Sequence, residues 1–225
     1  MKKRKYLFPI ITFLLSFGCA LFVALKVFPN NPFSGTKPEN GSANKIHDGD
    51  LIFQTSESKQ CEAVRIATNS KFSHCGIIFF VNGGEFVLEA VQPVKITPLE
   101  EWIAHGKDHK YLVKRLKNAE TVLTEDTLDK MKAYGKQLLG KEYDAYFEWT
   151  DNRIYCSELI WKIYKNGAGI ELSKLKQLKD FNLTDERVQK ILKERYGNDV
   201  PLDEEVVAPS DLVASDLLKT VIDTY

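Results

Sequence analysis

The chain of 225 residues carries 31 basic and 31 acidic side chains, so its formal net charge of zero gives no support for a nucleic-acid partner. An aromatic content of 11% excludes a disordered chain. The length that remains beyond an apolar N-terminal segment suits one domain with a sizeable core.

The N-terminus predicts a signal anchor over residues 1–28. Four basic residues at positions 2–5 precede the uncharged stretch Tyr6–Leu25, which is about long enough to cross a hydrocarbon core of ~30 Å as a helix. Basic residues stay on the cytoplasmic side, so we expect a membrane-anchored protein whose following domain is extracytoplasmic. The alternative is a cleaved signal peptide and a secreted domain, although no convincing cleavage site is present.

The rest of the chain divides into a linker and one domain. Residues 29–46 are rich in Pro, Gly, Ser and Asn and predict a flexible tether. Residues 47–225 show the alternating periodicities of short strands and helices. The expected strands are Asp50–Gln54, His74–Val81, Glu85–Val91 and Tyr111–Leu116. The expected helices are Ser58–Thr68, Leu99–Ala104, Thr124–Leu139 and Ile154–Asn166, with Phe181–Tyr196 and Ser210–Leu218 completing the set. Antiparallel strands with segregated helices predict an α+β fold.

Two short runs carry the candidate chemistry. Tyr155-Cys156-Ser157-Glu158-Leu159 places a cysteine at the start of a predicted helix, where unpaired N–H groups and the helix dipole favour thiolate. Ser73-His74-Cys75-Gly76 places a histidine at the start of a predicted buried strand, and a nearby imidazole can take the thiol proton. The pair predicts a cysteine hydrolase or acyl-transfer enzyme. A buried inert thiol and a solvated histidine are the alternatives.

The turn between two predicted strands suggests a third catalytic group. Asn82-Gly83 is a strong signal for a type I′ hairpin, and this turn sets Gly76 opposite Glu89. Glu89 then lies one diagonal step from His74 on the same sheet face, roughly 7 Å away along the backbone. A carboxylate there can orient the imidazole, although a slip of one residue moves it to the opposite face. Gln92 or a backbone carbonyl is the alternative orienter.

Cysteine usage is thin beyond Cys19. Three further cysteines remain, an odd number, and our expectation is a Cys61–Cys75 disulfide that leaves Cys156 free. The chain has no C-x-x-C spacing and no histidine pair at helical spacing, so we expect no metal site and no cofactor.

In combination, these motifs resemble the YiiX/YebB-like group of circularly permuted NlpC-type, papain-like cysteine hydrolases. The resemblance spans roughly Gly49 to Leu218 and rests on Gly49–Phe53, Ser73–Ile77, Glu89 and Tyr155–Leu159. It implies a papain-like core, in which the helix led by the nucleophile packs on an antiparallel sheet that carries the histidine and the third polar residue. It also implies a bacterial origin, which would place the extracytoplasmic catalytic domain in a bacterial cell envelope.

Carried over by position, the resemblance makes Cys156 the nucleophile, His74 the base and Glu89 the orienter. Cys75 departs from the pattern, because a second thiol beside the histidine leaves open which of the two reacts first with an alkylating probe. The expected reaction is amide hydrolysis through a thioester, with the Cys156 N–H and a second donor, for which Gln54 is a candidate, stabilising the oxyanion.

Three hypotheses remain for the function, two of which differ in the substrate. The predicted topology and the resemblance favour cell-wall peptides. A lipid-directed acyltransferase or phospholipase of the lecithin–retinol-acyltransferase-like type is the first alternative, because the permuted branch includes such proteins and this chain has a predicted membrane tether. A non-catalytic binding module is the second alternative. An open polar groove at the site would favour peptides, and an apolar tunnel would favour lipid chains.

Overall fold

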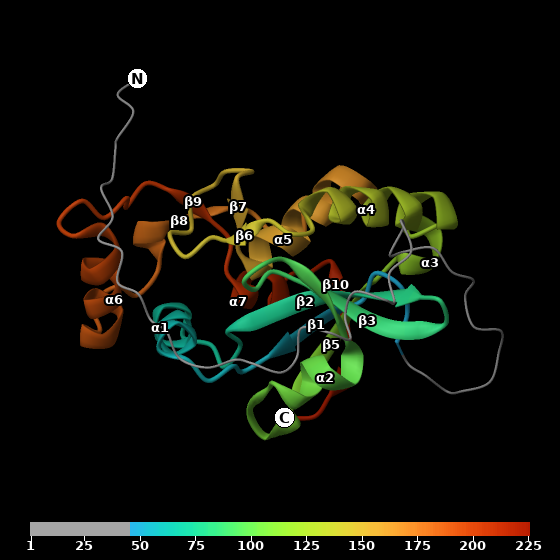
Figure 1. Cartoon of the computed structure of the whole chain (residues 1–225), viewed down its shortest axis with the longest axis horizontal. Coiled ribbons are helices and arrows are strands. Elements are labelled where there is room, and N and C mark those ends of the chain that lie inside the picture. Colours follow the sequence, from blue (N-terminus) through green and yellow to red (C-terminus); the bar gives the residue numbers. More distant parts are fainter. Residues whose placement is uncertain (1–45) are drawn as a thin grey trace. The chain divides into compact units, whose positions relative to one another are not determined.

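A six-stranded antiparallel sheet forms the centre of residues 46–225, the part of the chain that the computed structural model describes (Figure 1). Its strand order is β10-β5-β1-β2-β3-β4. The strands are β1 (Leu51–Gln54), β2 (His74–Val81), β3 (Gly84–Glu89), β4 (Lys95–Pro98), β5 (Tyr111–Leu116) and β10 (Leu218–Asp223). Two small pairs lie apart from it: β6 (Glu142–Tyr143) with β7 (Arg153–Ile154), and β8 (Lys176–Gln177) with β9 (Glu205–Val206).

Helices cover both faces of the sheet. They are α1 (Lys59–Thr68), α2 (Leu99–Ala104), α3 (Ala119–Val122), α4 (Glu125–Leu138), α5 (Cys156–Ile163), α6 (Glu186–Tyr196) and α7 (Pro209–Val213). Shorter helical turns are η2 (Lys107–His109), η3 (Tyr164–Ala168) and η4 (Leu178–Asp180). The chain therefore has the α+β architecture that the sequence predicts.

Strand alternation divides the core into two clusters. Phe53, Cys75 and Ile77 point toward the side of α4 and α5, where they pack in one cluster with residues such as Leu159. Their chain neighbours point to the other face, where Trp102 of α2 closes a second, smaller cluster. Figure 1 shows α4 and α5 on one side of the sheet and α2 on the other. Because side chains alternate along a strand, Cys75 leaves β2 on the face of α5, and His74 leaves it on the face of Trp102.

The hairpin of β2 and β3 has the predicted turn and register. Asn82 and Gly83 have φ values of 51° and 81°, as a type I′ turn requires. Ile77 pairs with Leu88, so the next pair along the ladder is Gly76 with Glu89. A Cβ on Gly76 would collide with the side chain of Val87 on β3 and would approach the Leu88 carbonyl oxygen to 3.1 Å. A glycine at this position therefore lets β3 pack closely against β2 beside the histidine.

Several predicted boundaries need correction. Ser210–Leu218 is not one helix: α7 ends at Val213, and the chain then enters β10, an edge strand beside β5 that the prediction missed. The Ile154–Asn166 helix begins two residues later, because Ile154 pairs in β7. α6 starts only at Glu186, where the Asp185 side chain accepts a hydrogen bond from the N–H of Arg187 and caps the helix.

The predicted signal anchor, residues 1–28, lies outside the described residues, as does the predicted linker apart from Ile46. Between residues 46 and 225, no helix combines the length and the apolar character that crossing a bilayer requires.

Candidate active site

Cys156 is the first residue of α5, and local hydrogen bonds fix the start of this helix. The Glu158 carboxylate accepts a hydrogen bond from the N–H of Tyr155 at 3.2 Å, which caps the first turn. Ser157 Oγ donates to the Val207 carbonyl at 2.8 Å, and the Tyr155 hydroxyl accepts from the Val207 N–H at 3.1 Å. Cys156 therefore sits on a rigid element, with the N–H groups of the first helical turn around it.

His74 and Glu89 form a direct, buried pair. His74 Nε2 lies 2.6 Å from Glu89 Oε2, and only 4% of the Glu89 side chain is exposed. The second carboxylate oxygen, Oε1, accepts a hydrogen bond from Thr97 Oγ1 on β4 at 2.5 Å. Both oxygens of Glu89 are thus engaged, which holds the carboxylate in one orientation toward the imidazole. The structure places Glu89 on the face of the sheet that the hairpin argument predicts.

Two neighbours on β2 both reach Cys156, although their side chains leave the strand on opposite faces. His74 and Cys75 each form a side-chain hydrogen bond with Cys156, and the backbone of Cys75 makes a third contact. With Nε2 bound to Glu89, the ring nitrogen left to meet the Cys156 sulfur is Nδ1.

These contacts shift the pKa values of the pair in opposite directions. Burial alone lowers the pKa of His74, but hydrogen bonds with Cys156 and Glu89 outweigh it and raise that pKa to about 10. The pKa of the Cys156 thiol is well below its usual value, chiefly because Cys75 hydrogen-bonds to it. Burial acts in the opposite direction, and the hydrogen bond and charge of His74 lower the pKa further. Both shifts favour a thiolate beside an imidazolium, which is the activated form of a cysteine nucleophile.

The pKa of Glu89 is lowered as well. Burial raises it, but the hydrogen bond and the charge of His74 dominate, with a smaller effect of Thr97. Glu89 is therefore an ionised acceptor, suited to holding the imidazolium.

Two contributors to the site were not found from the sequence. Thr97 fixes Glu89 from β4, and Trp102 stacks on the His74 ring with centroids 5.7 Å apart and planes 25° from parallel. The β-branched pair Ile96-Thr97 was the one local signal for β4. Nothing local pointed to Trp102, because its contact with His74 depends on the packing of α2 against the sheet.

The predicted Cys61–Cys75 disulfide is wrong. Cys61, Cys75 and Cys156 are all free thiols. The physical reason is strand alternation: Cys75 points into the core toward α5, whereas Cys61 lies half-buried on the first turn of α1.

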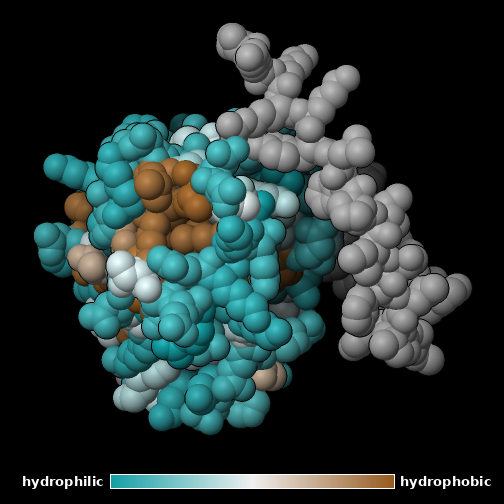
Figure 2. All heavy atoms as spheres, turned by 90° about the vertical axis from the view of Figure 1, so that its left-hand side faces the viewer, coloured by the Kyte–Doolittle hydropathy of each residue, from teal (hydrophilic) through white to brown (hydrophobic). Residues whose placement is uncertain are grey.

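An apolar pocket of about 90 Å³ opens at Cys156. Its lining includes Val64 and Ala67 of α1, Phe147, and Phe181 after η4, with few polar groups. Figure 2 shows an apolar area rimmed by hydrophilic residues on the side of the domain where α1 and α6 lie. The surroundings of Cys156 are thus suited to an apolar group rather than to a charged peptide.

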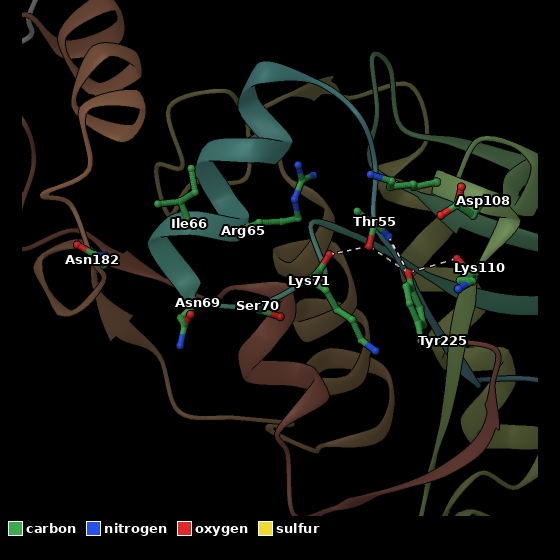
Figure 3. Close-up of a pocket in the computed structure, with 11 residues that line it drawn as sticks. Thr55, Arg65, Ile66, Asn69, Ser70, Lys71, Asp108, Lys110, Asn182 and Tyr225 are labelled. Carbon is green, nitrogen blue, oxygen red and sulfur yellow. Dashed lines mark hydrogen bonds between the residues drawn. The ribbon is translucent and has the colours of Figure 1, made fainter.

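A larger, polar cleft of about 720 Å³ lies on the other side of α1, and none of the three predicted catalytic residues lines it. In Figure 3 its floor is tied together by Thr55, whose hydroxyl donates to the Lys71 carbonyl at 2.8 Å and lies 3.2 Å from the Tyr225 hydroxyl. Gln54, the candidate oxyanion donor, lies directly opposite His74 on β1 and is not part of the pocket lining at Cys156. Its side chain packs against Gly106 instead.

Comparison with known proteins fits this geometry. Residues 45–222 match a family described as "Permuted papain-like amidase enzyme, YaeF/YiiX". The chain belongs to this family. It is 44% identical to the uncharacterized protein YiiX of Escherichia coli (strain K12) over 173 residues, which are 77% of this chain and 84% of that protein. A crystal structure of metalloprotein YiiX from Escherichia coli O157:H7 is similar with a TM-score of 0.77 and 42% identity, covering 80% of this chain and 99% of that one.

Membership in the permuted papain-like amidases confirms the resemblance predicted from the motifs and indicates a hydrolase of the amidase kind. The order along the chain also fits a permuted papain-like arrangement, because the sheet with His74 precedes the helix with Cys156. Within residues 46–225, no three His, Cys, Asp or Glu side chains converge to form a ligand set for a metal ion.

Proposed function

We propose that the protein is a cysteine amidase with a Cys156-His74-Glu89 triad. The observation that carries the proposal is the imidazole of His74, which bonds to Glu89 through Nε2 at 2.6 Å and to the thiol at the start of α5 through its other nitrogen. This is the nucleophile–base–orienter arrangement that activates a weak nucleophile. A non-catalytic binding module is less well supported, because binding alone does not require a thiol, an imidazole and a carboxylate in contact with one another.

The reaction proceeds in two halves. The Cys156 thiolate attacks the amide carbonyl carbon, and the oxyanion develops beside the free N–H groups at the start of α5. The His74 imidazolium gives its Nδ1 proton to the leaving nitrogen, so the C–N bond breaks and an amine departs, leaving a thioester. Neutral His74 then takes a proton from water, the hydroxide attacks the thioester, and the acid and the thiolate are released.

Two substrate classes remain as candidates. Cell-wall peptides are supported by the sequence resemblance and by the predicted extracytoplasmic location. A substrate with a lipid-like acyl group is favoured by the apolar lining of the pocket at Cys156. In the second case the acyl chain would lie between α1 and Phe181 while its carbonyl carbon meets the sulfur.

We expect cleavage to accelerate with the length of the acyl chain. Amides of one amine with acyl groups from acetyl to decanoyl should show kcat/KM rising by up to about fourfold per methylene while the chain is being buried. Ala67→Phe, which fills the pocket from α1, should remove this gain and leave acetyl cleavage intact. Ile66→Phe is the matched control, because Ile66 lines the polar cleft on the other side of the same helix. Cleavage of wall peptides with no dependence on acyl length would instead support the first class.

We also propose the membrane topology that the sequence predicts, with an N-terminal anchor and an extracytoplasmic domain. A reporter enzyme fused after Tyr225 should be active on the extracytoplasmic side, because the basic residues at positions 2–5 hold the N-terminus in the cytoplasm. The full-length chain should stay in the membrane fraction at high salt. Recovery of a shortened, released protein would show signal cleavage instead.

A further inference from the structure

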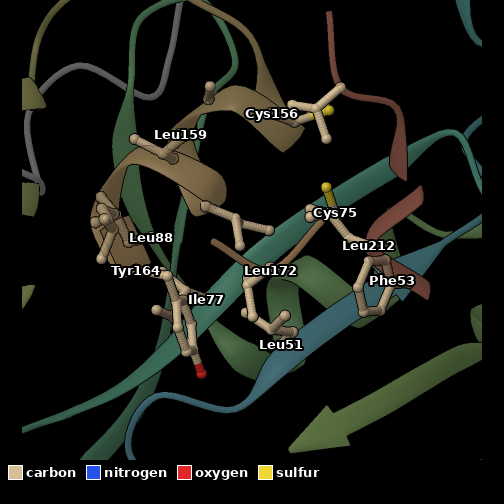
Figure 4. Close-up of a cluster of buried hydrophobic side chains, with 14 of the residues drawn as sticks. Leu51, Phe53, Cys75, Ile77, Leu88, Cys156, Leu159, Tyr164, Leu172 and Leu212 are labelled. Carbon is tan, nitrogen blue, oxygen red and sulfur yellow. The ribbon is translucent and has the colours of Figure 1, made fainter. Parts of the chain in front are cut away.

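The site contains a thiol that the proposed mechanism does not use. Cys75 lies on β2, fully buried, and its side chain points toward Cys156 at the start of α5 (Figure 4). The two side chains are hydrogen-bonded to each other. A buried pair of facing thiols, one of them the nucleophile, is the arrangement from which a disulfide can form.

We propose that Cys75 is a resolving cysteine, and that a peroxide converts Cys75 and Cys156 into a reversible disulfide that switches the enzyme off. This inference rests on the proposed function, because it takes Cys156 to be the reactive thiol. The switch protects the nucleophile, since a disulfide can be reduced whereas higher oxidation states of cysteine are irreversible.

The two thiols have different environments, and this decides their roles. Cys156 lines the pocket and is thus reachable by a small oxidant. Its low pKa makes it the thiolate that a peroxide oxidises first. Cys75 lies behind it, away from the pocket, and its pKa is raised, mainly by burial and also by its neighbour Cys156. Cys75 therefore keeps its proton until an electrophilic sulfur forms next to it.

The chemistry balances with hydrogen peroxide as the oxidant. The Cys156 thiolate attacks one peroxide oxygen, the O–O bond breaks, and the departing hydroxide is protonated to water, leaving a sulfenic acid. The Cys75 sulfur then attacks the sulfenic sulfur, the S–O bond breaks, and the leaving hydroxide takes the Cys75 proton to form a second water. Two thiols have lost two electrons in total, and one peroxide has become two waters.

The test uses the full-length chain with Cys19→Ser and Cys61→Ser, which leaves only the two thiols in question. After brief treatment with hydrogen peroxide, the intact mass should fall by about 2 Da, both thiols should resist alkylation, and a dithiol reductant should restore both. A peptide digest should contain the cross-link between the strand with Cys75 and the start of α5. Turnover should disappear and return with the same time course.

Cys75→Ser and Cys75→Ala remove the resolving thiol, and the two replacements guard against one of them failing to fold. In either variant the same treatment should add about 32 Da or more to the protein, and its own starting activity should not return with reductant. The Cys61 thiol is the matched control: restoring it to the two-thiol protein should leave the cross-link unchanged.

The proposal is wrong if the two-thiol protein gains oxygen without forming the cross-link. It is also wrong if reductant restores the activity of the two-thiol protein no better than that of the Cys75 variants. Mass and alkylation do not depend on turnover, so they separate this inference from the proposed function. If the cross-link forms but the Cys156→Ala variant still cleaves substrate, the disulfide proposal is supported and the catalytic role of Cys156 is wrong.

Discussion

Cys156→Ala is expected to abolish turnover, with a loss on the order of 10⁶-fold. The other thiol of the site, Cys75, is fully buried and does not line the pocket, so it should not replace Cys156 in forming the thioester. The methyl group is smaller than the thiol at a position that is 5% exposed, so the fold should be retained. The measurement is the rate of cleavage of the best acyl amide from the chain-length series. Intact mass after a substrate pulse gives a second readout, since the acyl adduct should be absent from the variant.

Cys75→Ala is the matched control, because it removes the neighbouring thiol from the same site. It should still form the acyl adduct, but its Cys156 should have a higher pKa, since the hydrogen bond from Cys75 is the largest cause of the low value. The pH dependence of alkylation measures that shift. If Cys75→Ala loses the adduct while Cys156→Ala keeps it, the nucleophile has been assigned to the wrong thiol.

Local signals in the sequence were sufficient for the elements that carry the site. The helix with Cys156 and the strand with His74 follow from short periodic runs, and the Asn-Gly turn fixes the register that brings Glu89 to the histidine. These features depend on residues close together in the chain, and their errors are limited to boundaries of a few residues.

Features that depend on distant packing could not be predicted in this way. Thr97 reaches Glu89 only because β4 adds to the sheet beside β3, and Trp102 meets His74 only because α2 folds over that face. β10 becomes an edge strand by pairing with β5, about 100 residues earlier in the chain. The expected disulfide failed for the same reason, since counting cysteines gives no information on which face of the sheet each one occupies.

Glu89→Gln tests the orienting role, and we expect it to lower kcat by about 10²-fold to 10⁴-fold while the fold is kept. Thr97 Oγ1 donates to one oxygen of Glu89, so the amide oxygen of the glutamine stays with Thr97. Its NH₂ group then faces His74 Nε2. Two donors cannot share a hydrogen bond, so Nε2 must give up its proton and Nδ1 must carry one. In this tautomer the neutral imidazole cannot take the proton of Cys156, so the thiolate–imidazolium pair of the parent does not form.

The same substitution should move the alkaline limit of activity. In the parent, we expect turnover to fall as His74 loses its proton, with a pKa of about 10. Glu89 is one of the groups that raise this pKa against the effect of burial, so its neutral replacement should shift the alkaline limb to lower pH. Glu85→Gln, the same change on the same strand, is the matched control and should leave rate and pH profile unchanged. A Glu89→Gln profile that superimposes on the parent, with kcat within tenfold, would falsify the role of Glu89, because a carboxylate that orients and charges the imidazole cannot be neutralised without altering both.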